Sequence, residues 1–411
     1  MENRRNQIDS KQPNTLTFGI LSLLLNPVLG VIFGAIGRKK GRDHIAQGNE
    51  LNGSSKVGYV LSLIGLILSI AVTAALYVFL LVLASLFTAE DSIFYFKWEM
   101  QLMEWLQSHI GSSGFAFWLL SNLSAFGEEI LLIAIMGFLY WGLNKEFGKY
   151  VGVNVLVANV WNPMIKNVIL RLRPYFVKGY RVELLRKIDA NAEIDDVAAQ
   201  GYSFPSGHSS NAVTMYGSLA AHEKKYKLFW ILAIVLPLLV GFSRVFVGAH
   251  FPTDVFAGWA LGIVIVLLIP FLRRKIKNRW IFYGILLLTT LPGFFYCKTD
   301  DYFSSFGMLI GFIFAEPFEE RFVRFENTKN FIRCILRTIG GGLIYFGLNT
   351  VLKMPFPKAM LEAGDLVSHL IRTLRYAVVI FTVIGVYPML FKQTDKLWNR
   401  IFKRKEAKLS K

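Results

Sequence analysis

Lys166-Asn-Val-Ile-Leu-Arg-Leu-Arg173-Pro174 is the first of three short polar clusters that interrupt apolar sequence. The second is Pro205-Ser206-Gly207-His208, and the third is Ser243-Arg244-Val-Phe-Val-Gly-Ala-His250-Phe-Pro-Thr-Asp254. Ionisable side chains are costly at membrane depth, so polar groups in such surroundings indicate a functional site. We therefore expect residues 166–254 to contain the site around which the chain is organised.

Composition identifies the class of protein. The 411 residues are 54% hydrophobic and 15% aromatic, only 18% are charged, and the mean hydropathy is +0.45. A soluble chain carries about 25% charged residues. Apolar runs of 18 or more residues recur along the sequence, which predicts an all-α, polytopic membrane helix bundle. The net charge of +17 is explained by basic cytoplasmic loops, and we expect no nucleic-acid partner.

The sequence divides into four parts. Residues 1–56 hold a polar start, an apolar segment and a basic loop. The apolar segment, 15–36, contains Asn26-Pro27, so it either spans the membrane or re-enters as an N-terminal hairpin. The remaining parts are a six-helix core at 57–271, an extension of four extra C-terminal helices at 272–391 and a basic tail at 392–411.

Ten spans are expected between residues 57 and 391, with an amphipathic interfacial helix inside 89–112. They are 57–88, 115–143, 150–172, 205–222, 229–247, 255–271, 280–297, 305–318, 338–352 and 373–391. If successive spans alternate in direction, loops on one side carry 28 Lys and Arg and loops on the other carry 9. The richer side is then cytoplasmic, and all three polar clusters open to the extracytoplasmic face.

The sequence predicts neither a disulfide nor a metal or cofactor site. Cys297 and Cys334 are the only cysteines, and this topology separates them by a bilayer thickness of about 30 Å. No Cys or His cluster has zinc-binding spacing.

In the first cluster, Lys166 and Arg173 are two helical turns apart and should project from one helix face, with Pro174 ending the helix. Arg171 lies off that face and is set aside. The plainer interpretation is that both cations extend to the membrane interface. Lys166 is deep for that role without an anionic partner.

The second and third clusters combine cations or free backbone N–H groups with a histidine. Ser206 and Gly207 form a helix start that can admit an anion, and His208 could protonate a leaving group. His250 and Asp254 are four residues apart, so the carboxylate could orient the imidazole. A capped helix start and a structural His–Asp pair are the plainer alternatives. Taken together with Lys166, Arg173 and Arg244, the two histidines predict a phosphoryl-transfer site.

These three motifs resemble the signature of the type-2 phosphatidic acid phosphatase family, which shares its site with vanadium haloperoxidases. The resemblance implies that His250 is a nucleophile forming a phosphohistidine, with Asp254 as its partner and His208 as general acid and later base. It implies that the phosphate is held by Lys166, Arg173, Ser206, Gly207 and Arg244. No metal takes part in this scheme.

The expected function is that of a bacterial, multi-pass cell-membrane phosphatase acting on a lipid phosphate or an isoprenoid or lipid diphosphate at the outer leaflet. The lipid and the oligomeric state stay open. A lipid phosphotransferase, a vanadate-dependent peroxidase and a transporter with a vestigial site are the alternatives.

Further polar residues outside the clusters are expected to be structural. Glu128 and Glu129 could contact the site cations or a substrate headgroup. The alternative is a break near Gly127 with Glu128 capping a new helix, and a structural or supporting role is favoured. Asn159 and Asn162 should hydrogen-bond between helices. An interfacial charge network is expected among Glu316, Glu319, Glu320, Arg321 and Arg324.

Overall fold

A computed structural model describes residues 28–63, 65, 94–187, 193–328, 330–396, 398 and 400. The chain forms two compact units, residues 1–90 and 91–411. Every regular element within the described residues is a helix, which confirms the all-α expectation. Cys297 and Cys334 are buried free thiols.

The first unit is described only in part. Helix α3, Val28–Ala46, is followed by a second helical stretch at 53–63. Arg38 of α3 lies 3.8 Å from the centre of the Tyr59 ring, so these two helices pack together. The start of the 15–36 segment and most of the 57–88 span lie outside the described residues, as does much of the 392–411 tail.

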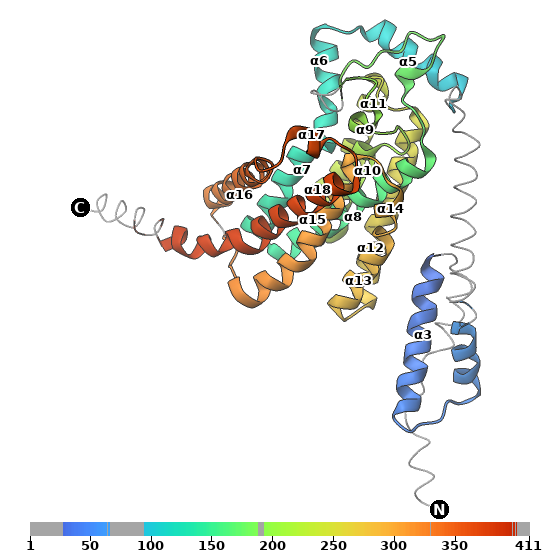
Figure 1. Cartoon of the computed structure of the whole chain (residues 1–411), viewed down its shortest axis with the longest axis vertical. Helices are drawn as coiled ribbons and strands as arrows, with labels where there is room; N and C mark the ends of the chain where they lie inside the picture. The colour runs from blue at the N-terminus through green and yellow to red at the C-terminus, as the bar shows by residue number, and fades with distance from the viewer. Residues whose placement is uncertain are drawn as a thin grey trace, which may run out of the picture. The chain divides into compact units, whose positions relative to one another are not determined.

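The second unit begins with α5 (Lys97–Ile110), α6 (Gly114–Asn122), η1 (Leu123–Gly127), α7 (Glu129–Gly137), η2 (Phe138–Leu143), α8 (Lys145–Ile169), η3 (Pro174–Phe176), α9 (Val197–Gln200), α10 (Gly207–His222), α11 (Lys227–Phe246) and α12 (Pro252–Lys275). It continues with α13 (Arg279–Thr290), α14 (Gly293–Tyr296), α15 (Asp300–Phe318), η4 (Glu319–Val323), α16 (Phe331–Val351), α17 (Lys358–Leu361), α18 (Leu366–Phe381), η5 (Thr382–Val386) and η6 (Tyr387–Leu390). Helices α15 and α18 run side by side (Figure 1).

Within the described residues, four helices are long and apolar enough to cross a membrane: Lys227–Phe246, Pro252–Lys275, Phe331–Val351 and Leu366–Lys396. A fifth span arises if Gly114–Gly127 and Glu129–Leu143, bent by 50°, are taken together. The protein is therefore a multi-pass membrane protein. The count of ten spans stays a prediction, since α10 has 16 residues and α13 has 12, against about 20 for a full crossing.

The bend in the fifth span falls where the two glutamates stand. Glu128 has extended backbone angles and occupies the N-cap position of α7. Its side chain does not cap that helix but pairs with Arg186 at 2.8 Å. The predicted break is confirmed, whereas capping by the carboxylate is wrong.

Polar side chains join α8 to α10. Asn154 donates to the Ser218 hydroxyl at 2.9 Å. Asn162 donates to the Ser210 hydroxyl at 3.5 Å and to the carbonyl of Pro205, just before α10, at 3.2 Å. Interhelical hydrogen bonds of this kind were expected at Asn162, because an apolar environment offers no competing water.

The glutamates near the end of α15 do form a charge network, but with partners other than those predicted. Lys149 of α8 lies 2.7 Å from Glu320 and 3.6 Å from Glu316, and Lys145 lies 3.0 Å from Glu319. Arg321 and Arg324 make no ion pair with these carboxylates in the described part of the chain. The network therefore connects α8 to α15 rather than stabilising one helix end.

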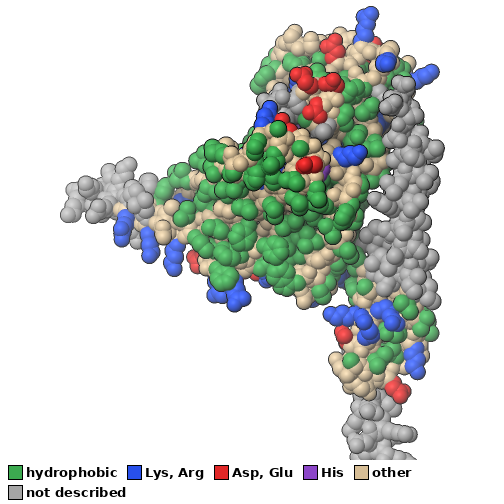
Figure 2. Space-filling model, viewed as in Figure 1, with side chains coloured by type: hydrophobic (Ala, Val, Ile, Leu, Met, Phe, Trp, Pro, Cys, Tyr) green, Lys and Arg blue, Asp and Glu red, His purple; other side chains and the backbone are tan. Residues whose placement is uncertain are grey.

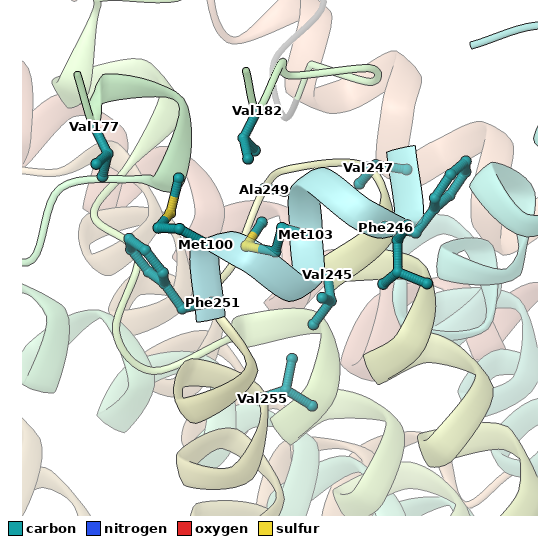
Figure 3. Packing of buried hydrophobic residues seen from close by; sticks show 11 residues of the cluster. Met100, Met103, Val177, Val182, Val245, Phe246, Val247, Ala249, Phe251 and Val255 are labelled. Atoms are coloured by element: carbon teal, nitrogen blue, oxygen red, sulfur yellow. The ribbon is translucent and has the colours of Figure 1, made fainter. Parts of the chain in front are cut away.

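Helix α5 is amphipathic, as predicted, and its apolar face packs on protein. Met100 and Met103 are fully buried against the chain between Val245 and Phe251, where α11 ends and α12 begins (Figure 3). Leu102 faces outward and is 39% exposed. The helix thus covers the turn that carries His250.

The second unit has an extensive apolar surface on the face seen in Figure 2, and Lys and Arg side chains lie mainly toward its edges. Exposed apolar side chains come from several helices, including Phe314, Leu343, Phe346, Leu374 and Val378. Such a surface suits contact with lipid.

Replacing Met103 tests the packing of α5. Met103→Ala leaves a cavity under the helix and should lower the free energy of unfolding by about 2–5 kcal/mol, read as a lower Tm in detergent. Leu102→Ala on the same helix is the control and should leave Tm nearly unchanged. Equal shifts for the two variants would contradict this packing.

Candidate active site

The helix that carries the first cluster ends earlier than the sequence predicted. Helix α8 ends at Ile169 because Leu170 adopts left-handed backbone angles, φ 54° and ψ 25°. Arg173 is therefore in extended chain, and Pro174 begins η3 instead of ending α8. The predicted shared helix face of Lys166 and Arg173 is wrong. The two side chains still meet, because both lie within 4 Å of the position that a Cβ on Gly201 would occupy.

Arg173 is fixed by backbone carbonyls on two sides. It donates from Nε to Gly201 at 2.8 Å, from Nη2 to Gln200 at 2.6 Å and from Nη1 to Ala249 at 2.7 Å. Nη1 also lies 3.3 Å from Nε2 of His250. Since guanidinium nitrogens only donate, this contact favours the tautomer whose Nε2 carries a lone pair.

His250 is linked to Asp254 through a hydroxyl. The direct distance from His250 Nδ1 to Asp254 Oδ2 is 3.7 Å. Ser203 Oγ donates to Asp254 Oδ2 at 2.5 Å and lies 3.5 Å from His250 Nδ1. The structure brings the two residues together, with Ser203, which the sequence did not single out, beside both.

The second cluster forms the start of α10. Ser206 is its N-cap, and the Ser206 Oγ accepts from the Ser209 hydroxyl at 2.9 Å. Gly207 is the first helical residue and faces Lys166, since a Cβ there would lie 4.0 Å from Lys166 Nζ. Helix α12 packs closely on this turn at Gly258, where a Cβ would come within 2.5 Å of the Ser206 carbonyl.

The cations of the site outnumber its available anions. Arg244 is buried, and its Nε and Nη2 have no hydrogen-bond partner among the described residues. His208 is half-buried and interacts electrostatically with four neighbouring groups: Arg244, His250, Lys166 and Arg173. Because unpaired buried charge is costly, this arrangement suits a bound polyanion.

No group of three or more His, Cys, Asp or Glu able to hold a metal occurs in the part of the chain that is described.

Arg171, set aside on the sequence, belongs to the site. Its Nη1 lies 2.6 Å from Asp254 Oδ1, and its Nη2 lies 2.9 Å from Glu99 Oε2. The prediction that Arg171 lies away from the site was wrong, because it assumed a helix that continues past Ile169. Glu99 was missed as well. The available signal was a carboxylate on the apolar face of α5, next to Met100.

Electrostatics keep His250 neutral. Burial first, and then the positive charges of Arg173, Arg244 and Lys166, hold the pKa of His250 well below its ordinary value of about 6.5. The Nε2 lone pair is therefore available at neutral pH.

The helical membrane fold and the buried cationic site define a class of membrane protein whose site is suited to an anion such as phosphate. Comparison with known sequences places the chain more narrowly. The PAP2 superfamily matches residues 147–278, and the description "PAP2 superfamily phosphatase, transmembrane extension" matches residues 303–399. The chain belongs to the PAP2 superfamily of membrane lipid phosphatases.

Several characterised relatives are similar over part of the chain. Phosphatidylglycerophosphatase B of Bacillus subtilis is 40% identical over 90 residues, which is 20% of this chain and 44% of the relative. Undecaprenyl-diphosphatase of Sulfolobus acidocaldarius is 32% identical over 142 residues, 34% of this chain and 62% of the relative. The chain thus spans about half the length of these relatives.

A solved structure was also matched. The crystal structure of the first transmembrane PAP2 type phosphatidylglycerolphosphate phosphatase from Bacillus subtilis is 24% identical, with a TM-score of 0.34. The match covers 50% of this chain and 97% of that protein.

Removing Arg171 tests the buried ion pairs. Arg171→Met leaves Asp254 and Glu99 buried without their cation, which should cost about 3–5 kcal/mol of stability, measured as a fall in Tm in detergent. Arg181→Met, at an exposed arginine, should leave Tm unchanged. A stable Arg171→Met protein would contradict the ion-pair argument.

Proposed function

We propose that this protein is an integral membrane phosphatase that hydrolyses a lipid phosphate or an isoprenoid or lipid diphosphate through a phosphohistidine, without a metal. The observation that carries the proposal is the 3.3 Å contact between Arg173 Nη1 and His250 Nε2, beside a buried Arg244 with unpartnered N–H groups. An unprotonated nucleophile, whose lone pair faces Arg173, and a cationic phosphate cradle thus share one space.

The first half-reaction forms a bond between His250 Nε2 and phosphorus. The bond between phosphorus and the lipid oxygen breaks, and His208 gives its proton to that oxygen. Lys166, Arg173 and Arg244, together with the N–H groups at the start of α10, stabilise charge on the equatorial oxygens. Of the residues assigned by resemblance, Gly207 fits this cradle. Ser206 fits it as well, since its Oγ accepts from Ser209 and its own O–H stays free to donate to a phosphate oxygen.

The positive charge that develops on the phosphorylated imidazole is balanced by Asp254. Ser203 and Arg171 hold the two oxygens of that carboxylate at 2.5 and 2.6 Å, so it is already oriented before substrate arrives. In the second half-reaction, His208 takes a proton from water, the water oxygen bonds to phosphorus, and the bond between phosphorus and His250 breaks. Inorganic phosphate and neutral His250 result.

The relatives' names support both substrate classes. One is a phosphatidylglycerophosphatase, a second an undecaprenyl-diphosphatase and a third, from Rhizobium etli, a lipid A 1-phosphatase that is 30% identical over 115 residues, 28% of this chain and 45% of the relative. The excess of Lys and Arg on one side of the predicted topology supports a site at the outer leaflet.

Histidine variants test the reaction. In a panel of phosphatidylglycerol phosphate, undecaprenyl diphosphate and phosphatidic acid, with EDTA present, the protein should release free phosphate. His250→Ala should lower the rate on the order of 10³-fold or more, and His208→Ala by about 10²–10⁴-fold. His222→Ala is the matched control, because that ring stacks on Phe147 at the opposite end of α10.

Three results would oppose the proposal. They are an active His250→Ala variant, activity that returns only on adding a divalent metal, and consumption of the lipid without free phosphate. The last would indicate a phosphotransferase. Acid-labile phosphate retained on wild-type protein after rapid quenching, and absent from His250→Ala, would support the covalent intermediate.

The low pKa of His250 sets the acid side of the pH profile. A nucleophile with a depressed pKa stays neutral below pH 6.5 and is lost only when pH falls through its lowered value. We expect the acid limb of kcat/KM to lie below pH 6.5 for a diphosphate substrate. Arg244→Gln removes one charge that lowers this pKa, so its residual activity should show an acid limb at higher pH. A wild-type limb at or above 6.5 would contradict the electrostatics.

A further inference from the structure

The start of α15, outside the three sequence motifs, reaches the phosphate cradle. Asp301 Oδ2 lies 3.7 Å from Lys166 Nζ. It also lies 4.0 Å from the position of a Cβ on Gly201, next to Arg173 Nη2. The carboxylate comes from the segment immediately before the matched transmembrane extension, residues 303–399.

The turn that carries Asp301 is attached to both halves of the second unit. On the core side, Asn167 donates to Thr299 Oγ1 at 2.7 Å and accepts from the Lys298 backbone at 2.9 Å. On the extension side, Asp300 lies 2.5 Å from Arg372 of α18. The backbone around Asp301 is therefore held against α8 on one side and α18 on the other, and this keeps its carboxylate beside Lys166.

The surroundings of Lys166 explain why it needs this carboxylate. Lys166 is buried, and charged or titratable groups face it from every element around it: Arg173, Arg244, His208, His250, Asp254 and Asp301. Asp254 is engaged by Arg171 and Ser203. Among the described residues, Asp301 is the carboxylate in ion-pair contact with Lys166.

We propose that Asp301 is a positioning residue of the phosphatase site, which keeps Lys166 protonated and directed at the phosphate of the substrate. The inference rests on the proposed function. A nearby opposite charge favours the charged form of an amine, whereas burial and neighbouring cations oppose it. Asp301 is 42% exposed, so its carboxylate can remain hydrated when substrate oxygens take over part of the contact with Lys166.

The test is the pH dependence of the inhibition constant for inorganic phosphate in Asp301→Asn, since binding of phosphate needs the charge of Lys166 but no proton transfer from His208. Without the carboxylate, Lys166 loses its proton at lower pH, so the alkaline limb of this binding profile should move down by roughly one pH unit. Near pH 6, where Lys166 stays protonated, phosphate binding should remain close to that of wild type. Asp301→Glu should restore the wild-type limb.

The neighbouring residue provides a matched control. Asp300→Asn, in the same helical turn, removes the ion pair with Arg372 but no contact with Lys166. Its alkaline limb should coincide with that of wild type. A purely structural role for Asp301 would weaken phosphate binding equally at all pH values, and that result would overturn the inference.

Repeating the test in a Lys166→Arg variant isolates the role of the Lys166 amine. Arginine stays protonated at all accessible pH, so Lys166→Arg, although less active, should make the profile insensitive to Asp301→Asn. A limb that still shifts in that background would place the effect on another group and refute the proposal. These outcomes are independent of His250→Ala, since the catalytic scheme can hold while the Asp301→Asn profile stays unchanged.

Discussion

The buried bridge from Asp254 through Arg171 to Glu99 is the constraint on which the site depends. Taking three charges out of water is expensive, and the cost is offset only when their geometry and hydrogen bonds are satisfied. Here Thr253 donates to Glu99 at 2.6 Å, and the Phe251 backbone donates to Asp254 at 2.8 Å. Arg171, in the chain after α8, thereby holds the start of α12 and helix α5 in place relative to each other.

This bridge separates two kinds of charge in a small volume. The carboxylates on one side, Asp254 and Glu99, are paired with Arg171, and Asp254 also lies 3.7 Å from His250 Nδ1. On the other side, Arg244 has Nε and Nη2 without a hydrogen-bond partner among the described residues. A protein gains no stability from that excess. Under the proposed function, it is a preorganised environment for a charge that arrives with the substrate, and the remaining packing must compensate for it.

The extension is joined to the core at both ends of α15. At one end Asp301 and Thr299 contact Lys166 and Asn167. At the other, Glu316 and Glu320 contact Lys149. Both sets of contacts involve α8, the helix that also carries Lys166. The extension is therefore in direct contact with the helix that carries Lys166.

The sequence by itself determined the helical class, the membrane environment and the three polar clusters. Hydropathy and short spacings are local properties, and His250 and Asp254, four residues apart, are close because the chain between them is short. Only the tertiary structure decided what lies around them. Arg171 is 72 residues from Glu99 and 83 from Asp254, and no local pattern encodes such pairs. The left-handed Leu170 redirects the chain after α8, so Arg171 and Arg173 enter the site by a route that helical periodicity cannot predict. The contact of Asp301 with Lys166 likewise depends on how α15 docks, which is a matter of packing between helices and not of sequence spacing.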